Sequence, residues 1–154
     1  MKVRVLLTLA GAAISFAVPA FAAQDAMIAV AADEVVWKDD TLFKGAQIAN
    51  LLGDPAKAET VVMRVKWPPN FKVPLHTHPV TEVLTVLSGT LVDSMGDETK
   101  KGVVLKPGSL FVLPANHIHS IWTTDEETIF QLSFTGPFDI TFINPADDPR
   151  KKAQ

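Results

Sequence analysis

Histidines are the residues of this chain whose spacing most clearly indicates chemistry. All four occur as two pairs, His76-x-His78 and His117-x-His119. Residues two apart in a β-strand point to the same face, so His76 and His78 can direct both imidazoles at one point. Glu82 follows at the start of the next apolar run, and His119 lies on a later one. If these strands close into a barrel, His76, His78, Glu82 and His119 can meet, which predicts a metal site.

The types of ligand indicate one divalent transition metal ion. Imidazole together with carboxylate suits borderline ions, of which Fe and Mn lead here and Ni, Cu and Zn are alternatives. The absence of cysteine disfavours Cu(I), and the single carboxylate disfavours Ca²⁺. A lone histidine is usually an ordinary core or surface residue, but two pairs with a matched glutamate favour a site. Four protein ligands would leave open positions on an octahedral ion for substrate, water or dioxygen.

Two residues are candidates for a catalytic role beside the metal. Glu82 is one, because a carboxylate ligand that detaches can act as a base. His117 is the other, because it shares strand parity with His119. Its side chain can line the mouth of a pocket, hydrogen-bond a substrate or simply face solvent, and the pattern leaves these alternatives open.

Three further residues are candidates for substrate binding. Gln131 alternates with phenylalanines in the run 128–134, and one of the two sets should face the barrel interior. Arg64 lies in a run that can reach the cavity and bind an anionic substrate, although a solvated arginine is the commoner case. Trp122 can stack on a substrate or pack in the core. The alternation of side chains alone does not decide which face of each strand lines the interior.

The elements that must position these residues are short strands separated by turn residues. Runs rich in β-branched and apolar residues, bounded by Gly, Pro and Asn, favour an antiparallel barrel or sandwich. The expected strands cover 59–67, 71–78, a pair within 82–92, 102–105, 110–113, 117–123, 128–134 and 138–143. One or two helical turns are expected near 53–57. Residues 23–58 should supply N-terminal strands and a connection, 59–143 the barrel, and 144–154 a surface tail.

The first residues of the chain have the pattern of a secretory signal peptide. Lys2 and Arg4 precede an uncharged stretch from Val5 to Val18, and Ala20-Phe21-Ala22 matches a small-x-small cleavage site. The apolar stretch is shorter than the roughly 18–20 residues of a membrane-spanning helix. We expect residues 1–22 to be removed, with cleavage after Ala23 as a near alternative. The mature protein is then expected in the periplasm or secreted, without a membrane partner.

Composition limits the functions that the mature chain can perform. Of the 14 Lys and Arg residues two lie in the signal peptide, which leaves 12 against 17 Asp and Glu, a net charge of −5. This balance disfavours a nucleic-acid partner. The one basic cluster, 150–152, is expected to be solvated. With no cysteine and no tyrosine, the fold has no disulfides and the site has neither a thiolate nor a phenolate.

The first histidine pair lies in a stretch that resembles a motif of the cupin superfamily, G-x5-H-x-H-x3-E-x6-G. His76, His78, Glu82 and Gly89 match it at every spacing. Asn70 stands where the motif has its leading glycine, and asparagine tolerates left-handed backbone angles better than most residues. The departure therefore concerns the turn and not the ligands.

The second histidine pair falls in the stretch that resembles the other cupin motif, G-x5-P-x-G-x2-H-x3-N. Gly108, Pro114 and His119 match. Asn116 replaces the inner glycine and Thr123 the final asparagine, both of them turn or scaffold positions. All four ligand positions of the two motifs are therefore retained.

The resemblance implies an all-β fold, the antiparallel cupin β-barrel (double-stranded β-helix or jelly roll). It also implies a homodimer. A metal-dependent enzyme that acts on a small organic molecule is the leading expectation, with oxygenase-type chemistry first among the reactions. A non-catalytic protein that binds a metal ion or a small ligand is the alternative. The fold alone does not choose between them.

Overall fold

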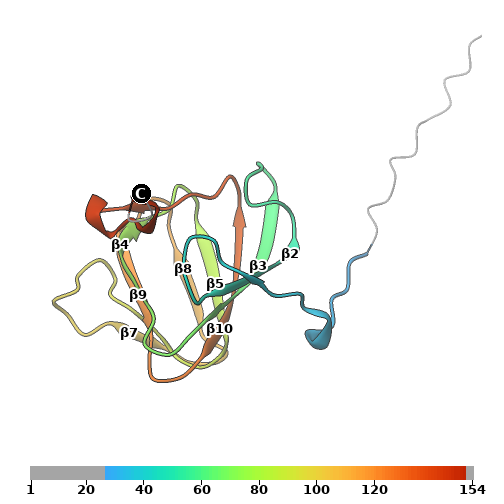
Figure 1. Ribbon diagram of the computed structural model, residues 1–154, viewed down its shortest axis with the longest axis horizontal. Coiled ribbons are helices and arrows are strands. Elements are labelled where there is room, and N and C mark those ends of the chain that lie inside the picture. Colours follow the sequence, from blue (N-terminus) through green and yellow to red (C-terminus); the bar gives the residue numbers. More distant parts are fainter. Residues whose placement is uncertain (1–26, 152–154) are drawn as a thin grey trace, which may run out of the picture.

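The computed structural model describes residues 27–151, and the expected signal peptide lies outside these residues. The described chain forms two antiparallel sheets that face each other, the jelly-roll arrangement of a cupin (Figure 1). One sheet has six strands in the order β1 (Lys38–Asp39), β2 (Gln47–Leu52), β3 (Thr60–Trp67), β10 (Thr128–Thr135), β5 (Glu82–Ser88) and β8 (Leu110–Leu113). The other has five, in the order β11 (Thr141–Phe142), β4 (Lys72–Thr77), β9 (His119–Thr123), β6 (Leu91–Asp93) and β7 (Val103–Leu105).

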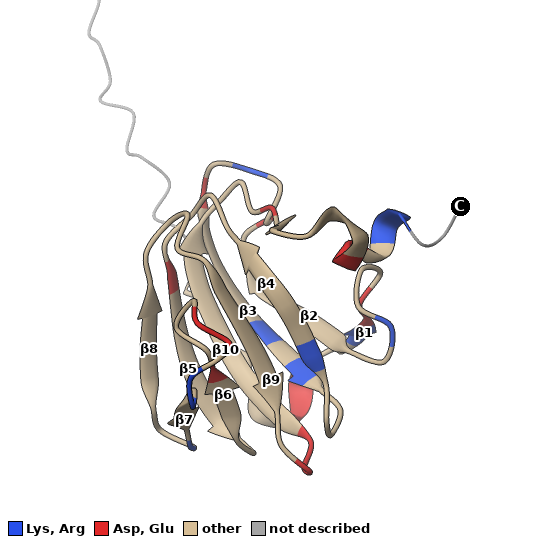
Figure 2. Ribbon diagram, turned by 90° about the vertical axis from the view of Figure 1, so that its left-hand side faces the viewer, with Lys and Arg blue, Asp and Glu red and all other residues tan. Residues whose placement is uncertain are grey.

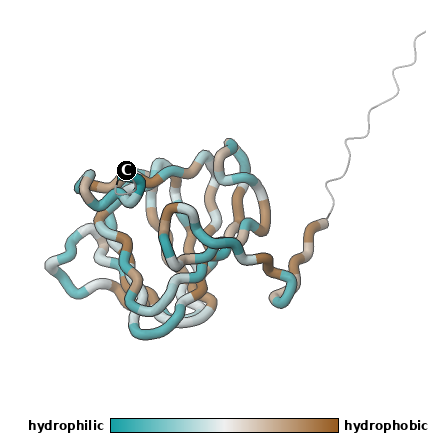
Figure 3. Tube along the Cα trace, viewed as in Figure 1, coloured by the Kyte–Doolittle hydropathy of each residue, from teal (hydrophilic) through white to brown (hydrophobic). Residues whose placement is uncertain are grey.

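Alternation of side chains along the strands builds the core between the two sheets. In β3 the residues Val61, Met63, Val65 and Trp67 are buried, while those between them are half-exposed. The apolar set of β10 is likewise buried and packs in the same core cluster. Figure 3 shows hydrophobic and hydrophilic segments alternating in the barrel, with hydrophilic residues frequent in the connections. The period of two therefore assigns one face of each strand to the interior.

Two asparagines make the turns for which the cupin motifs use glycine. Asn70 and Asn116 have φ angles of 58° and 62°, in the left-handed region that favours glycine. The backbone N–H of Asn70 donates to the carbonyl of Thr124, and that of Asn116 donates to the carbonyl of His78. The motif turns are thus preserved by residues that tolerate this conformation.

The prediction of helical turns near 53–57 is wrong. This segment is the connection between the antiparallel strands β2 and β3, and it contains hydrogen-bonded turns instead. Asp54 accepts from the N–H groups of Ala56 and Lys57, and Glu59 accepts from the N–H of Asp54. Because the chain must reverse within these residues to pair β2 with β3, no room is left for a helix.

The helical elements of the described chain are three short 3₁₀ segments, η1 (Ala32–Glu34), η2 (Pro145–Asp147) and η3 (Pro149–Lys151). No helix among residues 27–151 is long and apolar enough to cross a membrane. The expected strand at 138–143 is shortened to β11. The expected surface tail is partly docked, because Asp148 is buried and Arg150 binds it and the main chain of Ile140. Arg150 is therefore not simply a solvated member of a basic cluster.

Candidate metal centre

The ends of three strands bring the four residues of the sequence-predicted metal site together. His76 lies near the end of β4 and His78 just beyond it, while Glu82 begins β5 and His119 begins β9. His76 and His119 are direct partners across the β4–β9 pair. The register of this pair shifts between Val73 and His76, in a stretch where a proline removes one ladder donor.

The histidine cluster, which we define as His76, His78 and His119, is compact and buried. One ring nitrogen of each lies within 4.8 Å of the others, and the three residues are between 2% and 6% exposed. Glu82, also 6% exposed, lies beside the cluster with its Oε2 3.8 Å from Nε2 of His78. All four residues face one end of the same cavity.

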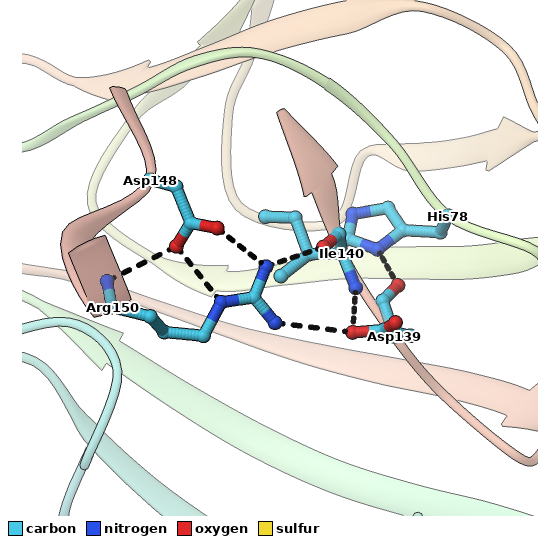
Figure 4. A network of polar contacts seen from close by, with 5 residues as sticks. All are labelled: His78, Asp139, Ile140, Asp148 and Arg150. Atoms are coloured by element: carbon cyan, nitrogen blue, oxygen red, sulfur yellow. Dashed lines mark hydrogen bonds and ion pairs between the residues drawn. The ribbon is translucent and has the colours of Figure 1, made fainter. Parts of the chain in front are cut away.

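Backbone carbonyls orient the three imidazoles. Nδ1 of His76 lies 2.7 Å from the carbonyl oxygen of Pro74, and Nδ1 of His78 lies 2.8 Å from that of Asp139 (Figure 4). A longer contact of 3.4 Å joins Nδ1 of His119 to the carbonyl of His117. A carbonyl oxygen can only accept, so Nδ1 carries the proton and Nε2 keeps its lone pair. This is the tautomer and the outer support that metal-ligating histidines have.

Burial keeps the three imidazoles neutral at physiological pH. Loss of solvation, with a smaller contribution from the neighbouring histidines, lowers the pKa of His76 to about 3 and that of His119 to about 4. The pKa of His78 is also lowered, again chiefly by burial. Burial, with a smaller contribution from Asp93, raises the pKa of Glu82 to about 8. Three neutral donors and one carboxyl group without a cationic partner fit a divalent metal ion.

The cavity beside the cluster has a volume of about 230 Å³ and lies between the two sheets. Aliphatic and aromatic side chains from both sheets and from the loop before β2 form most of its wall. Its aromatic residues are Phe43, Trp67, Phe111, Phe130 and Phe138. The rings of Phe138 and His78 stack with their centroids 4.6 Å apart, so the apolar wall reaches the cluster directly.

The three substrate-binding candidates do not reach this cavity. Arg64 and Gln131 lie side by side on the outer face of the six-stranded sheet, where Nε of Arg64 donates to Oε1 of Gln131 at 3.4 Å. Trp122 lies on the outer face of β9, with Nζ of Lys72 5.6 Å from its ring centroid. None of the three is among the residues that line the cavity, so the roles that we expected for them are not supported.

His117 is exposed on the turn before β9 and does not line the cavity either. Its side chain is thus outside the space that a substrate would occupy, although its carbonyl supports His119. Sequence reasoning missed Asp139, whose carbonyl orients His78, and Asp40, which lines the cavity from a distant loop. Neither residue belongs to a recognisable motif, so no sequence signal indicates them.

Residues 63–134, just under half of the chain, match the family model of the cupin domain. Among curated proteins, germin-like protein 8-6 from Oryza sativa subsp. japonica is 38% identical over 92 residues. The match covers 54% of this chain and 41% of the rice protein, so the chain spans less than half the length of this relative.

Solved structures share the fold at low sequence identity. The polyketide cyclase RemF from Streptomyces resistomycificus aligns with a TM-score of 0.69 and 19% identity, covering 84% of this chain and 94% of that one. The DMSP lyase DddQ from Ruegeria pomeroyi aligns with a TM-score of 0.59 and 21% identity, covering 73% and 63%. At these identities the likeness concerns the fold.

Proposed function

We propose that this chain is an exported, metal-dependent enzyme that acts on a small organic molecule, as the match to the cupin domain at residues 63–134 suggests. Oxygenase-type chemistry is the leading reaction class. The observation that carries this proposal is the position of the histidine cluster and Glu82 at the end of a cavity. A storage or structural site would be closed, whereas an enzyme needs space beside its metal.

Each residue of the site has a role that follows from its surroundings. The three imidazoles would hold the ion as neutral donors, and the carbonyls behind them would keep the rings from turning. Glu82 would supply the negative charge, and its raised pKa allows it to take up a proton when it is released from the metal. The apolar wall would limit the entry of water.

Iron or manganese is the leading candidate for the ion, with nickel, copper and zinc as alternatives. When bound, such an ion supplies a Lewis acid or a site for dioxygen. The enzymes named among the structural relatives act in different ways, so they do not select the reaction.

A non-catalytic binding protein is the second candidate function, and one observation favours it. Among the described residues, the only ionisable side chains that line the cavity are the histidine cluster, Glu82 and Asp40. A dedicated acid or base apart from the ligands is therefore restricted to Asp40. A protein that holds a metal ion or a small ligand would need no such group.

The deciding experiment is elemental analysis of the protein purified from its native compartment, without added metal or a histidine tag. About one equivalent of Fe, Mn, Ni or Cu per chain, followed by oxygen uptake with chelating diketones or hydroxy acids, would support the enzyme. One equivalent of metal without turnover of any substrate would support the binding protein. A chain without metal, or with only substoichiometric zinc, would contradict the enzyme and leave a protein that binds a small ligand.

Export is proposed from the signal-peptide pattern of residues 1–22. N-terminal sequencing of the native protein tests it directly, since cleavage should expose Ala23, or Gln24 at the alternative site. A mature protein that retains Lys2 and Arg4 would contradict export by this route.

A further inference from the structure

The charge of the cavity wall restricts what can bind beside the metal. Among the described residues no lysine or arginine lines the cavity. The two cations of β3, Arg64 and Lys66, alternate with its cavity residues and do not line the cavity. Arg64 binds Gln131, and Nζ of Lys66 lies 4.4 Å from the ring centroid of Trp37. An anionic group placed within the cavity would lose its hydration without gaining a cationic partner, apart from the metal itself.

Asp40 makes the opening toward its own loop still less suitable for an anion. Its Oδ1 accepts from the N–H groups of Leu42 and Phe43 at 2.7 and 3.1 Å, which fixes the turn of this loop. The ring of Phe43 then packs edge-on against Phe71 with centroids 6.0 Å apart. The loop thus adds one carboxylate and two apolar side chains to the wall.

The size of the cavity indicates a ligand of about one ring. An engineered cavity of roughly 150 Å³ holds a benzene molecule. By that measure the present volume of about 230 Å³ accommodates on the order of ten non-hydrogen atoms. The walls offer aromatic faces and edges from β3 and β10, with the Trp67 and Phe130 centroids 4.8 Å apart.

One hydrogen-bond donor of the wall has no partner. Trp67 lines the cavity and is 6% exposed, and its buried indole N–H has no acceptor among residues 27–151. A buried donor of this kind is usually satisfied. It can be satisfied here by a neutral acceptor oxygen on the bound molecule.

From these features we propose the substrate class of the site. The molecule is apolar and about one ring in size, apart from the polar end that meets the metal. It carries no charged group elsewhere. This inference rests on the proposed function, because the polar end is assigned to a metal held by the histidine cluster and Glu82.

A matched pair of chelators tests the inference on the zinc-loaded protein. The catechols 4-methylcatechol and 3,4-dihydroxybenzoate share their two oxygens and their ring, and differ at the far end in a methyl or a carboxylate group. Binding of each catechol is measured by calorimetry under anaerobic conditions and corrected for its affinity for free zinc. We expect 4-methylcatechol to bind the protein at least about tenfold more tightly than 3,4-dihydroxybenzoate. Equal binding, or a preference for the carboxylate, would overturn the proposal.

A charge-introducing variant provides the reciprocal test. Met63 faces the cavity and Val62, its neighbour on β3, does not. Met63→Lys should shift the preference toward 3,4-dihydroxybenzoate, while Val62→Lys should leave the preference of the wild type within about twofold. A Met63→Lys protein that folds but keeps the wild-type preference would contradict the proposal.

A metal-independent measurement separates failure of this inference from failure of the proposed function. In protein labelled with ¹³C-methyl methionine, the Met63 methyl reports on the cavity, and the exposed Met95 serves as the internal control. Without metal, 4-methylcatechol should shift the Met63 resonance alone, and 3,4-dihydroxybenzoate should shift neither. Absence of zinc uptake would defeat the metalloenzyme, whereas an unshifted Met63 resonance would defeat the apolar substrate class.

Discussion

Single residues decide whether the site can hold a metal ion, and the imidazoles are not interchangeable with other donors. Each ring of the histidine cluster has one nitrogen facing a carbonyl oxygen, so only the other nitrogen is free to bind an ion. Burial lowers their pKa values and keeps them in the unprotonated form that metals require.

Removal of one ligand should therefore abolish stoichiometric metal binding. We expect His76→Ala and His119→Ala each to weaken metal affinity by more than about 100-fold. Even substitution of a residue that only hydrogen-bonds to a ligand weakens metal affinity by roughly 10–100-fold. His117→Ala is the matched control, since its side chain is exposed and outside the cavity. Elemental analysis with circular dichroism checks this, and full metal content in either ligand variant would show that the assignment is wrong.

Asp93 is a buried carboxyl whose ionisation should weaken the fold. Burial raises its pKa to about 6, opposed by the N–H of Met95 and by His117, and its Oδ2 has no hydrogen-bond partner. Because the pKa in the folded state exceeds the ordinary value of 3.8, the folded protein binds the extra proton. Its contribution to stability is complete below about pH 4 and is lost as the pH rises through 6.

Asp93→Asn should accordingly raise the free energy of unfolding of the metal-free protein at pH 8 and change this free energy little at pH 4. The asparagine keeps an acceptor for Met95, so the gain at pH 8 should reach about 1–2 kcal/mol. Urea unfolding at both pH values measures the difference. A variant that is no more stable than the wild type at pH 8 would contradict the raised pKa of Asp93.

At the scale of elements, the C-terminal 3₁₀ segments support the site from outside the barrel. Arg150 binds Asp148 through Nε at 2.8 Å, and donates to the carbonyl of Ile140 at 3.0 Å (Figure 4). The adjacent carbonyl of Asp139 holds the ring of His78. A segment that resembles a solvated tail in the sequence therefore fixes the connection before β11, which orients a ligand.

Arg150→Met should weaken metal affinity by several-fold without removing any ligand. The expected loss of metal affinity is smaller than for a residue that hydrogen-bonds directly to a ligand, because Arg150 acts through residues 139–140. Competition with a chromogenic chelator measures the affinity, and Lys151→Met is the control because Lys151 is exposed on the same segment. Identical affinities for the two variants would show that the segment does not position His78.

At the scale of the whole molecule, one end of the six-stranded sheet presents apolar side chains to solvent. The patch consists of Val83, Leu87, Leu110 and Val112 on β5 and on β8, the last strand of that sheet. Val83 and Val112 are cross-strand partners, and β8 carries no charged residue (Figure 2). A contiguous exposed apolar surface on a strand at the edge of a sheet favours association.

We propose that this patch forms the interface of the homodimer expected from the cupin resemblance. The double variant Leu110→Lys with Val112→Lys should be monomeric by light scattering, because two buried lysines would face each other across the interface. Val104→Lys on β7, exposed at the edge of the other sheet, is the control and should remain dimeric. A wild-type protein that is monomeric would contradict the proposal.

The sequence by itself determined the strands and the residues of the cluster. Runs of β-branched and apolar residues between turn residues predicted β3, β8 and β10 to within one residue. The spacing of His76, His78, Glu82 and His119 also predicted a convergence. In the structure the three histidines cluster, Glu82 lies beside them, and all four line one cavity. These features depend on local periodicity and on motif spacing, which a single chain displays directly.

Only the tertiary structure decided which other residues share the site. The alternation of side chains divides β10 into two faces. Which face meets the opposite sheet depends on contacts between residues distant in sequence, and these contacts place Phe130 inside and Gln131 outside. Strand pairing likewise excluded a helix at 53–57 and carried Arg64 to the outer surface. Asp40, Asp139 and Arg150 reach the site only through the fold, because each acts across a distance that local sequence patterns do not record.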